Sequence, residues 1–336
     1  MPAISVLMPF RNTAQYLGES IASLRAQTYA NFELLLVDDA STDGSRGIAA
    51  SAAASDSRIH LLVNSDNRGL AWSLNRALDS SSSKYVARMD ADDVSLPFRF
   101  ERQLAFLESH SDIDMVGGAI QIFGDKQKIQ RYPERSDEIE NILFFKTGMA
   151  HPLFFFKRES WMREGLRYDE SYRVAQDHEL LSRAAGRLRM ANLPDVLLKY
   201  REHRGQESKT RREERLQNDT RLSVAYLMRR FPDCGDEDTR ALTAILRSSS
   251  CPEAKEFMRV AEWLCRFYDR ISNGTPSSSF VRHVVARKLF MFCRANSRHG
   301  PSAVRAFTRS AFARDTPYSR VGFARFLFLA ILRWRP

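Results

Sequence analysis

Short apolar segments alternate with helical patterns through the first hundred residues of the chain. Four mainly apolar runs predict buried strands, at residues 4–8, 32–37, 59–63 and 85–89. Helical spacing of apolar residues predicts helices between and after them, at residues 17–24, 48–54, 70–78 and 97–107. Buried strands joined by helices indicate a parallel sheet that is covered on both faces. We therefore expect an α/β fold with a mainly parallel sheet.

The pattern changes in the second half of the chain. Residues 115–123, 151–156 and 196–200 predict further strands, and residues 179–185 predict a helix. Beyond Arg211 only helical patterns remain, with a loop or linker predicted at residues 272–279. The sequence therefore predicts two parts: an α/β domain over residues 1–210 and a helical C-terminal region over residues 211–336.

The two parts differ in charge. Residues 1–200 contain 24 Lys and Arg against 27 Asp and Glu, whereas residues 201–336 contain 27 against 14. The basic excess favours an anionic partner, such as a membrane surface. No nucleic-acid reading motif accompanies the charge, so nucleic acid is not an expected partner.

The end of the chain predicts an interfacial helix with an apolar body and a basic, Trp-containing rim. Its residues are Arg325, Phe326, Leu327, Phe328, Leu329, Ile331, Leu332, Arg333, Trp334 and Arg335. Two alternatives remain open for this basic region: a helical cap packed on the front domain, and a homodimer interface.

Cysteine spacing and the termini bear on the compartment. The spacings between Cys234, Cys251, Cys265 and Cys293 match no zinc or CxxC pattern, so free thiols are expected. The N-terminus lacks the pattern of a signal peptide, and the apolar run at residues 326–332 is far shorter than the ~20 residues of a spanning helix. We expect a cytoplasmic protein, peripheral on the inner face of the cell membrane.

Polar clusters follow the predicted strands, where parallel strands bring their carboxyl ends to one edge of the sheet. The sharpest is Asp90, Asp92 and Asp93, which repel one another unless a cation neutralises them. The alternative is an acidic turn that caps the next helix. Arg88, just before the cluster, is a candidate phosphate partner.

Two further clusters lie after the second and third strands. Asp39 follows the second strand and can accept from a nucleotide base or ribose, while Thr42 and Asp43 provide cap chemistry. Asn67 and Arg68 follow the third strand and are weaker candidates for the wall of a nucleotide pocket.

Four motifs now point to a family. Residues 1–205 resemble the inverting glycosyltransferases of family 2, which have the Rossmann-like GT-A fold. The motifs are residues 4–12 (ISVLMPFRN), 37–44 (VDDASTDG), 67–75 (NRGLAWSLN) and 87–93 (ARMDADD). Their common order and spacing make the resemblance specific, although each motif alone is weak.

The resemblance implies roles for these positions. Asp90-Ala91-Asp92 is similar to the DxD signature of the family, with Asp92 as metal ligand and Asp90 near the ribose. The implied nucleotide-sugar site comprises Pro9, Phe10, Asn12, Asp39, Asn67, Arg68, Arg88, Asp90 and Asp92. The implied ligands for Mn²⁺ or Mg²⁺ are Asp92, Asp93 and His203, the last in a Tyr-Arg-x-His element at residues 200–203.

The resemblance also implies a catalytic base. The family places an Asp in a Glu-Asp pair that opens a helix; here the pair is Gln176-Asp177, so Asp177 keeps the role while its neighbour departs from the pattern. An acceptor hydroxyl needs such a base to lose its proton as it attacks. The alternative for Asp177 is a helix N-cap. His151, in a His-Pro pair, is the candidate on the acceptor side.

The expected function is transfer of a hexosyl or N-acetylhexosaminyl group from a nucleotide-sugar, with UDP the expected nucleotide. The expected acceptor is a glycan or a lipid-linked glycan in surface polysaccharide synthesis. Two other classes stay open: a sugar nucleotidylyltransferase, and a catalytically inactive membrane-associated scaffold on the same fold.

Overall fold

The computed structural model describes residues 2–124, 127–203, 205–206, 210–272, 279–313 and 320–332. The chain divides into two compact units. The first contains residues up to 140 and residues 147–215, and the second contains residues 141–146 and 216–336. The sequence prediction placed the boundary at residue 210 and did not anticipate that residues 141–146 join the helical unit.

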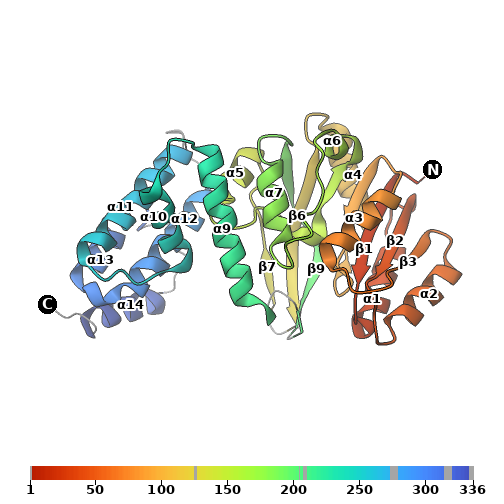
Figure 1. Ribbon diagram of the computed structural model, residues 1–336, viewed down its shortest axis with the longest axis horizontal. Helices are drawn as coiled ribbons and strands as arrows, with labels where there is room; N and C mark the ends of the chain where they lie inside the picture. Colours follow the sequence, from red (N-terminus) through yellow and green to blue (C-terminus); the bar gives the residue numbers. More distant parts are fainter. Residues whose placement is uncertain are drawn as a thin grey trace. The chain divides into compact units, whose positions relative to one another are not determined.

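The first half of the α/β unit follows the predicted alternation of strands and helices (Figure 1). Its elements are β1 (Ile4–Phe10), α1 (Ala14–Arg25), β2 (Phe32–Asp38), α2 (Ser45–Ser55), β3 (Ile59–Val63), α3 (Leu70–Ser80) and β4 (Tyr85–Arg88). All seven residues of β1 are buried, which explains why its sequence is apolar on both faces. The four strands are parallel and lie in the order β3-β2-β1-β4.

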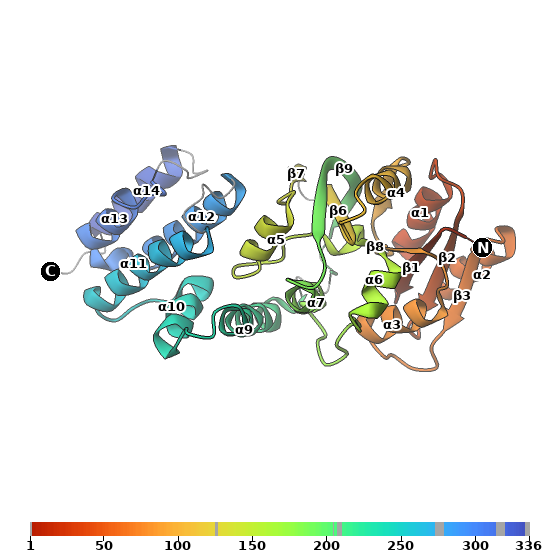
Figure 2. The same ribbon diagram turned by 90° about the horizontal axis from the view of Figure 1, so that it is seen from above.

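This strand order creates a switch point between β1 and β4. The connections through α1 and α2 carry the chain outward from β1, whereas α3 returns it to the other side of β1. Right-handed crossovers in opposite directions place helices on opposite faces. In Figure 2, α1 lies on one face of the sheet and α3 on the other. Ligands of open α/β sheets bind at such a switch point, outside the carboxyl ends of the strands.

The second half of the sheet is mixed, whereas the four strands of the first half are all parallel. The full order is β3-β2-β1-β4-β8-β6-β9-β5, with β7 paired to β6. The additional strands are β5 (Val94–Ser95), β6 (Met115–Gly124), β7 (Lys128–Gln130), β8 (Phe155–Lys157) and β9 (Met190–Glu202). Only β6 and β9 are parallel here; the β4–β8, β5–β9, β6–β7 and β6–β8 pairs are antiparallel.

The strand predicted at residues 151–156 is only partly correct. His151–Leu153 forms a 3₁₀ helix, η1, and the strand begins at Phe155. Its apolar sequence reflects burial rather than extension, because Leu153 in the 3₁₀ helix and Phe154 directly after it are both fully buried.

Further helices complete the layers of the α/β unit. They are α4 (Arg99–Ser109), α5 (Ser136–Ile142), α6 (Arg158–Arg163) and α7 (Gln176–Ala184). The core lies between the sheet and these layers, with Val6 and Leu34 from the strands and Phe100 from α4 fully buried. Each such side chain contributes about 1.5–3 kcal/mol when it is removed from water.

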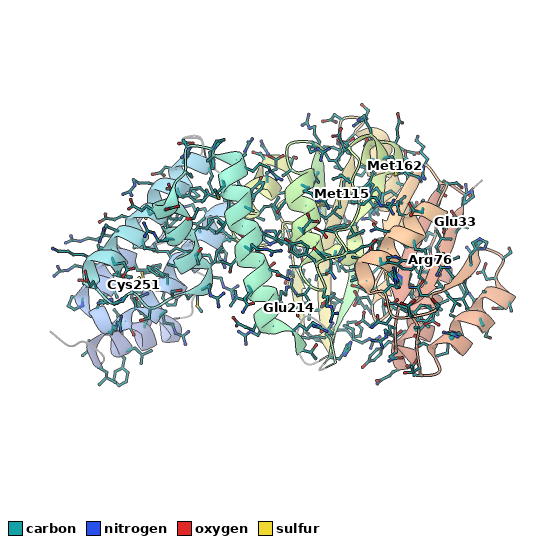
Figure 3. All side chains as sticks on the ribbon, in the orientation of Figure 1. Glu33, Arg76, Met115, Met162, Glu214 and Cys251 are labelled. Atoms are coloured by element: carbon teal, nitrogen blue, oxygen red, sulfur yellow. The ribbon has the colours of Figure 1, made fainter. Side chains whose placement is uncertain are left out.

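The second unit is helical, as predicted. Its elements are α9 (Arg212–Arg230, which begins at the end of the first unit), α10 (Asp236–Arg247), α11 (Ala254–Ile271), α12 (Ser279–Ala295), η2 (Ser297–His299), α13 (Pro301–Thr308) and α14 (Arg320–Leu332). Phe144 packs edge-on against Phe267 in its core, with ring centroids 5.0 Å apart. All four cysteines are free, and Cys251 is buried within this unit (Figure 3).

The membrane-related expectations concern α14. Arg333, Trp334 and Arg335 lie outside the described residues, as does most of the linker predicted at residues 272–279. Among the helices that the structure describes, none is long and apolar enough to span a bilayer.

Candidate active site

Two cavities meet at the carboxyl end of β4. The first has a volume of about 670 Å³ and is lined by the segments that follow β1, β2, β3 and β4. The second has a volume of about 400 Å³ and is lined by β6, η1 and the loop that leads into α7. Asp90 and Asp92 line both cavities. The first cavity will be called the strand-end cavity and the second the inner cavity.

The strand-end cavity brings together most residues predicted to bind nucleotide. Its lining includes Pro9, Phe10, Asn12, Asp39, Asn67, Arg68, Asp90 and Asp92. These residues come from four different loops, so their convergence follows from the parallel order of the strands. The placement agrees with the predicted site, although the role of each residue remains a prediction.

Asp39 organises the wall of this cavity. It is 5% exposed, and its carboxylate accepts from the backbone N–H groups of Arg68 and Gly69, both at 2.8 Å. It also accepts from the Asn64 side-chain amide at 2.8 Å. The Asn67 amide satisfies its neighbours when its nitrogen faces Asp39, and it then donates to the Asp39 carboxylate at 2.7 Å. A carboxylate has about four acceptor positions. A nucleotide base would therefore have to share an oxygen that already holds the 67–69 turn.

The loop after β2 also caps the helix that follows β1. Asp43 accepts from the backbone N–H of Ala14 at 3.0 Å and from that of Ser45 at 2.9 Å, so it serves α1 as well as its own helix. Thr42 donates its backbone N–H to Asn12 Oδ1 at 2.8 Å. Satisfying the free N–H groups of the first helical turn joins the two loops that border the cavity.

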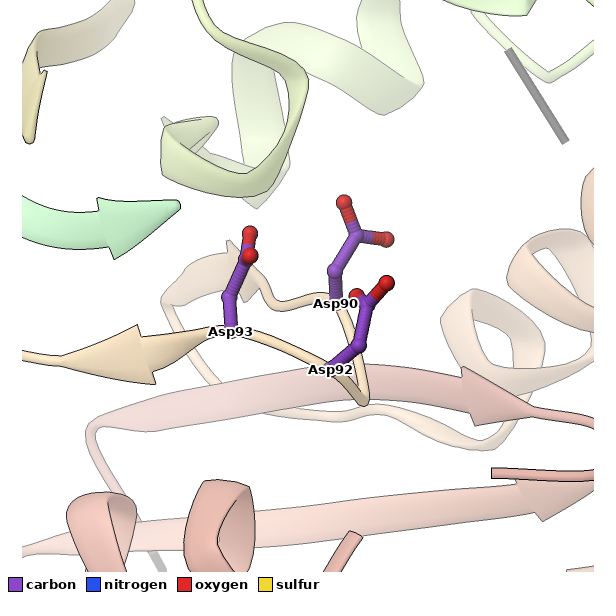
Figure 4. Close-up of side chains that lie close together, drawn as sticks. All are labelled: Asp90, Asp92 and Asp93. Atoms are coloured by element: carbon purple, nitrogen blue, oxygen red, sulfur yellow. The ribbon is translucent and has the colours of Figure 1, made fainter. Parts of the chain in front are cut away.

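The acidic cluster follows β4, and Figure 4 shows its three side chains on the same side of the loop. One carboxylate oxygen from each of Asp90, Asp92 and Asp93 lies within 4.8 Å of the others. Burial, together with the nearby charge of Asp92, raises the pKa of Asp90 to about 6, although the Arg88 guanidinium opposes the shift. The cluster is thus an arrangement of mutually repelling charges.

Arg88 lies in a different place from the one expected. Its side chain is 3% exposed, lines the inner cavity and forms an ion pair with Asp90. Arg99, which is fully buried, donates to the Arg88 carbonyl oxygen at 2.7 Å and fixes the backbone there. The predicted contact of Arg88 with the nucleotide would therefore be indirect, through Asp90.

Asp93 and His203 differ in how they relate to the cavities. Asp93 is fully buried, and one of its oxygens accepts from the Arg201 backbone N–H at 2.8 Å. Burial raises its pKa well above the usual value. His203 lines the strand-end cavity, with Nε2 3.0 Å from Asp92 Oδ2. Of the three predicted metal ligands, Asp92 and His203 line the strand-end cavity, whereas Asp93 is buried and lines neither cavity.

The donor set fits a hard divalent cation. Carboxylate oxygens are the preferred ligands of Mg²⁺ and Mn²⁺, and imidazole also binds Mn²⁺. The second oxygen of Asp93 is buried without a hydrogen-bond partner, and a nearby cation would offset the cost of burying it. A cation would also relieve the repulsion between Asp90 and Asp92.

Asp177 lies in the inner cavity, in the first turn of α7. The N-cap position is occupied by Ala175, so the N-cap role that sequence left open for Asp177 is not observed. Of the three carboxylates that line the inner cavity, Asp90 pairs with Arg88 and Asp92 with His203. Within the described part of the chain, the Asp177 carboxylate makes no hydrogen bond or ion pair.

His151 also lines the inner cavity, close to Tyr168. Its Nε2 lies 3.0 Å from the Tyr168 hydroxyl. Burial, together with the positive charge of Arg88, lowers the pKa of His151 well below its usual value. The imidazole is therefore neutral and cannot act as a cationic contact for an acceptor.

Sequence reasoning missed the residue that links these groups. Arg201 donates from Nε to the Asp92 carbonyl oxygen at 2.8 Å, and its guanidinium stacks between Tyr16 and Phe123 at 4.8 and 4.5 Å from the ring centroids. Its Nη2 also pairs with Glu19. The Tyr-Arg-x-His element drew attention to this segment, but its spacing gave no indication of what the arginine contacts.

The switch point in the sheet and the acidic cluster after β4 point to the GT-A class of transferases. The sequence model for Glycosyl transferase family 2 matches residues 5–166. The chain is 32% identical over 209 residues to the O-antigen biosynthesis glycosyltransferase WbnJ of Escherichia coli, covering 60% of this chain and 80% of that protein. This chain belongs to glycosyl transferase family 2 and is a glycosyltransferase.

Solved structures agree on the fold. S. aureus TarS 1–349 in complex with UDP-GlcNAc is 18% identical with a TM-score of 0.58, and the match covers 94% of this chain and 89% of that one. The mannosyltransferase PcManGT from Pyrobaculum calidifontis, in complex with GDP-Man and Mn²⁺, is 18% identical with a TM-score of 0.52, covering 99% and 86%. The predicted GT-A fold with a helical C-terminal region is confirmed.

Proposed function

We propose that this glycosyltransferase uses a divalent cation to transfer a sugar from a UDP-sugar to a hydroxyl of a glycan or lipid-linked glycan, with inversion at the anomeric carbon. The sugar would be a hexose or an N-acetylhexosamine, and the product a surface polysaccharide. The observation that carries the proposal is the meeting of two cavities at Asp90 and Asp92, with the free carboxylate of Asp177 in the inner one.

The strand-end cavity suits the nucleotide. Pro9 and Phe10 provide an apolar border for a base, and Asn67 and Arg68 provide polar groups on the opposite loop. The polar groups of the wall are held by Asp39, so the cavity is organised before any ligand enters. A wall organised in this way lowers the entropy cost of binding.

Asp92 and His203 would hold the cation at the junction, with Asp90 beside them. When bound, the cation would supply positive charge against the diphosphate that leaves. Arg201 holds the Asp92 backbone, and Arg88 holds the Asp90 carboxylate. These contacts fix the ligands before binding and so reduce the reorganisation that the reaction requires.

Asp177 would be the general base. It lies in the inner cavity with no competing partner among the described residues, whereas Asp90 and Asp92 are each paired. A single base that deprotonates the acceptor hydroxyl is sufficient for a one-step displacement with inversion. Retaining glycosidases, in contrast, need a second carboxylate that attacks the sugar.

The inner cavity would take the acceptor. Tyr132 and Tyr200 line it together with Ile120, and these apolar surfaces suit the C–H face of a sugar ring. His151 is neutral and is bonded to Tyr168, so it shapes the wall rather than supplying charge.

A donor panel tests the proposal. Purified protein is incubated with UDP-glucose, UDP-galactose, UDP-GlcNAc and GDP-mannose, with lipid and glycan extracts as acceptors, in Mn²⁺ or in EDTA. We expect release of a nucleoside diphosphate that depends on acceptor and is abolished by EDTA. Turnover that is unchanged in EDTA would contradict the cation. Pyrophosphate release from a nucleoside triphosphate and a sugar phosphate would indicate a nucleotidylyltransferase, and nucleotide binding without any turnover would indicate a scaffold.

We also propose that the helical unit attaches to an anionic membrane surface through α14. Phe328, Ile331 and Leu332 share one face of this helix and are 60%, 75% and 63% exposed. From residue 271 to the end, the chain has 12 Lys and Arg and one acid, Asp315. Burial of the three side chains at about 1.5–3 kcal/mol each, with about 1 kcal/mol per nearby basic residue, is enough for peripheral binding.

Vesicle flotation tests this attachment. The full chain should float with vesicles that contain anionic phospholipid and not with neutral ones. Ile331→Asp should abolish flotation, whereas Met228→Asp, at an exposed position on α9, should not. A dimer in sedimentation that Ile331→Asp dissociates, without flotation of the parent protein, would identify a second copy as the occupant of this face instead.

A further inference from the structure

Arg173 lies at the junction of the two cavities. Both cavities are lined by Leu70, Asp90, Asp92, Arg173 and Gln206. Arg173 is the only cation in this shared set of described residues. The diphosphate of a nucleotide-sugar would occupy this junction, because it connects the nucleotide in one cavity with the sugar that faces the other.

The Arg173 guanidinium is available for a ligand. Arg173 is exposed, and within the described part of the chain its guanidinium makes no ion pair or hydrogen bond. Other arginines that line the cavities are engaged: Arg88 pairs with Asp90, Arg68 with Asp66 and Arg211 with Glu214. A bound cation would neutralise the carboxylates of Asp90 and Asp92. The unpaired guanidinium of Arg173 beside them would then be available to bind the phosphate groups of a ligand.

The backbone at Arg173 is fixed although its side chain is exposed. Val174, Ala175 and Gln176, the next three residues, are 5%, 4% and 6% exposed. Ala175 has a φ of 68°, a left-handed conformation that few non-glycine residues adopt. Packing of these residues therefore determines where Arg173 stands relative to Asp177, four positions later.

Gln176 provides the specific tie. Its Nε2 donates to the Arg173 carbonyl oxygen and closes the turn between them. An ionised Glu at this position could not make this bond, because it has no hydrogen to donate. The Gln at this position, where the family pattern has Glu, thus has a structural consequence in this chain.

On the basis of the proposed function, we propose that Arg173 binds the diphosphate of the donor, and that Gln176 is a positioning residue that aims it. A planar guanidinium can bind two phosphate oxygens at once, which adds orientation as well as charge. Since Arg173 and Asp177 belong to one short fixed turn, binding the diphosphate would also set the distance from the base to the sugar.

Calorimetric titration of the full chain with UDP, UMP and uridine, each with Mn²⁺, tests the role of Arg173. A charge-assisted hydrogen bond corresponds to roughly ten- to hundred-fold in affinity. Arg173→Gln should weaken UDP by this factor, weaken UMP less and leave uridine unchanged. Arg163→Gln, an exposed arginine on α6 next to Glu164, is the matched control and should change none of the three. If GDP binds more tightly than UDP, the guanine series replaces the uracil series.

The outcomes separate this inference from the proposed function. Absence of binding by any nucleoside diphosphate would contradict the proposed function. Binding of UDP that Arg173→Gln leaves unchanged would contradict only the role of Arg173. An equal loss for UDP and uridine would show that the variant disturbs the whole cavity, and this too would overturn the inference.

A double-mutant cycle tests Gln176. Gln176→Glu should weaken UDP several-fold in the parent protein and have little further effect in Arg173→Gln, because the two residues act on one contact. The midpoint of thermal unfolding is measured for each variant. Independent, additive losses of UDP affinity, or a loss of thermal stability with UDP affinity unchanged, would overturn the positioning role.

Discussion

Replacing Arg201 by Met tests how the acidic loop is held. The side chain is 15% exposed and makes three kinds of contact: a hydrogen bond to the Asp92 carbonyl, stacking on Tyr16 and Phe123, and an ion pair with Glu19. Met keeps an apolar chain between the rings but loses every contact of the guanidinium. The backbone N–H that donates to Asp93 is unaffected by the change.

The magnitude follows from these contacts. A hydrogen bond from a charged donor contributes about 1.5–3 kcal/mol, and each stacking contact about 0.5–1 kcal/mol. Glu19 is 58% exposed, so its ion pair contributes little. Since Met retains part of the packing, we expect a net loss of about 3 kcal/mol in the stability of the loop.

Hydrogen exchange measured by mass spectrometry reports the local stability of the loop. Calorimetric titration of Mn²⁺ in the presence of UDP gives the Mn²⁺ affinity. In Arg201→Met, peptides covering residues 88–96 should exchange faster by about two orders of magnitude, since 1.4 kcal/mol corresponds to a factor of ten. Mn²⁺ should bind more weakly. Arg58→Met is the control, because Arg58 also stacks on a ring, Phe32 at 4.5 Å, but lies away from both cavities. Unchanged exchange in these peptides, or an equal loss of Mn²⁺ affinity in the control, would refute the reasoning.

Three further predictions concern the inner cavity and its support. Asp177→Asn should lower kcat by about 10²–10⁴-fold while UDP affinity is retained; a variant with normal turnover would exclude Asp177 as the base. Because burial lowers the pKa of His151, the folded protein should lose stability as the pH falls below 6.5, by up to about 1.4 kcal/mol per pH unit from this residue. In urea titrations between pH 7 and pH 5, His151→Gln should show a smaller loss, and an unchanged slope would contradict the assignment. Trp161→Ala should lower the free energy of unfolding by about 3–5 kcal/mol, because the ring is fully buried and stacked on Phe156. Trp161→Phe should lower it much less, because it keeps a buried ring and removes an indole N–H that has no partner. Equal midpoints of the two variants in urea would contradict this.

The first half of the fold could be predicted from the sequence because its signals are local. The residues of β1 are buried on both faces, so an unbroken apolar run was sufficient to identify the strand. The second half was harder because its pairings are not local. In β9, Asp195 and Lys199 interrupt the apolar pattern, and a bulge shifts its register with β6 after Gly118. Only the segment at residues 196–200 was therefore predicted, out of a strand that covers Met190–Glu202.

The site shows the same division. The residues that follow strands, such as Asp39 and Asp90, could be brought together by topology alone, since parallel strands end at one edge. Their partners could not. Arg99 contacts a backbone carbonyl oxygen in the last residue of β4, and Arg201 contacts one in the loop after it, from 11 and 109 positions along the chain. A carbonyl oxygen has no sequence signature, so an arginine that binds one looks like any other arginine.

Backbone strain at the site suggests how the two cavities are kept in register. Four non-glycine residues in the described chain have positive φ: Asn12, Ala40, Ala175 and Ser248. Asn12 lines the strand-end cavity, Ala40 directly follows Asp39 of its wall, and Ala175 lines the inner cavity. Each left-handed residue costs of the order of 1 kcal/mol or more and persists only where its surroundings determine the conformation. At Ala175 the surroundings are buried neighbours that also fix Arg173 and Asp177. The strained residue therefore lies in the turn that, in the proposed mechanism, would bind the leaving diphosphate through Arg173 and deprotonate the attacking hydroxyl through Asp177.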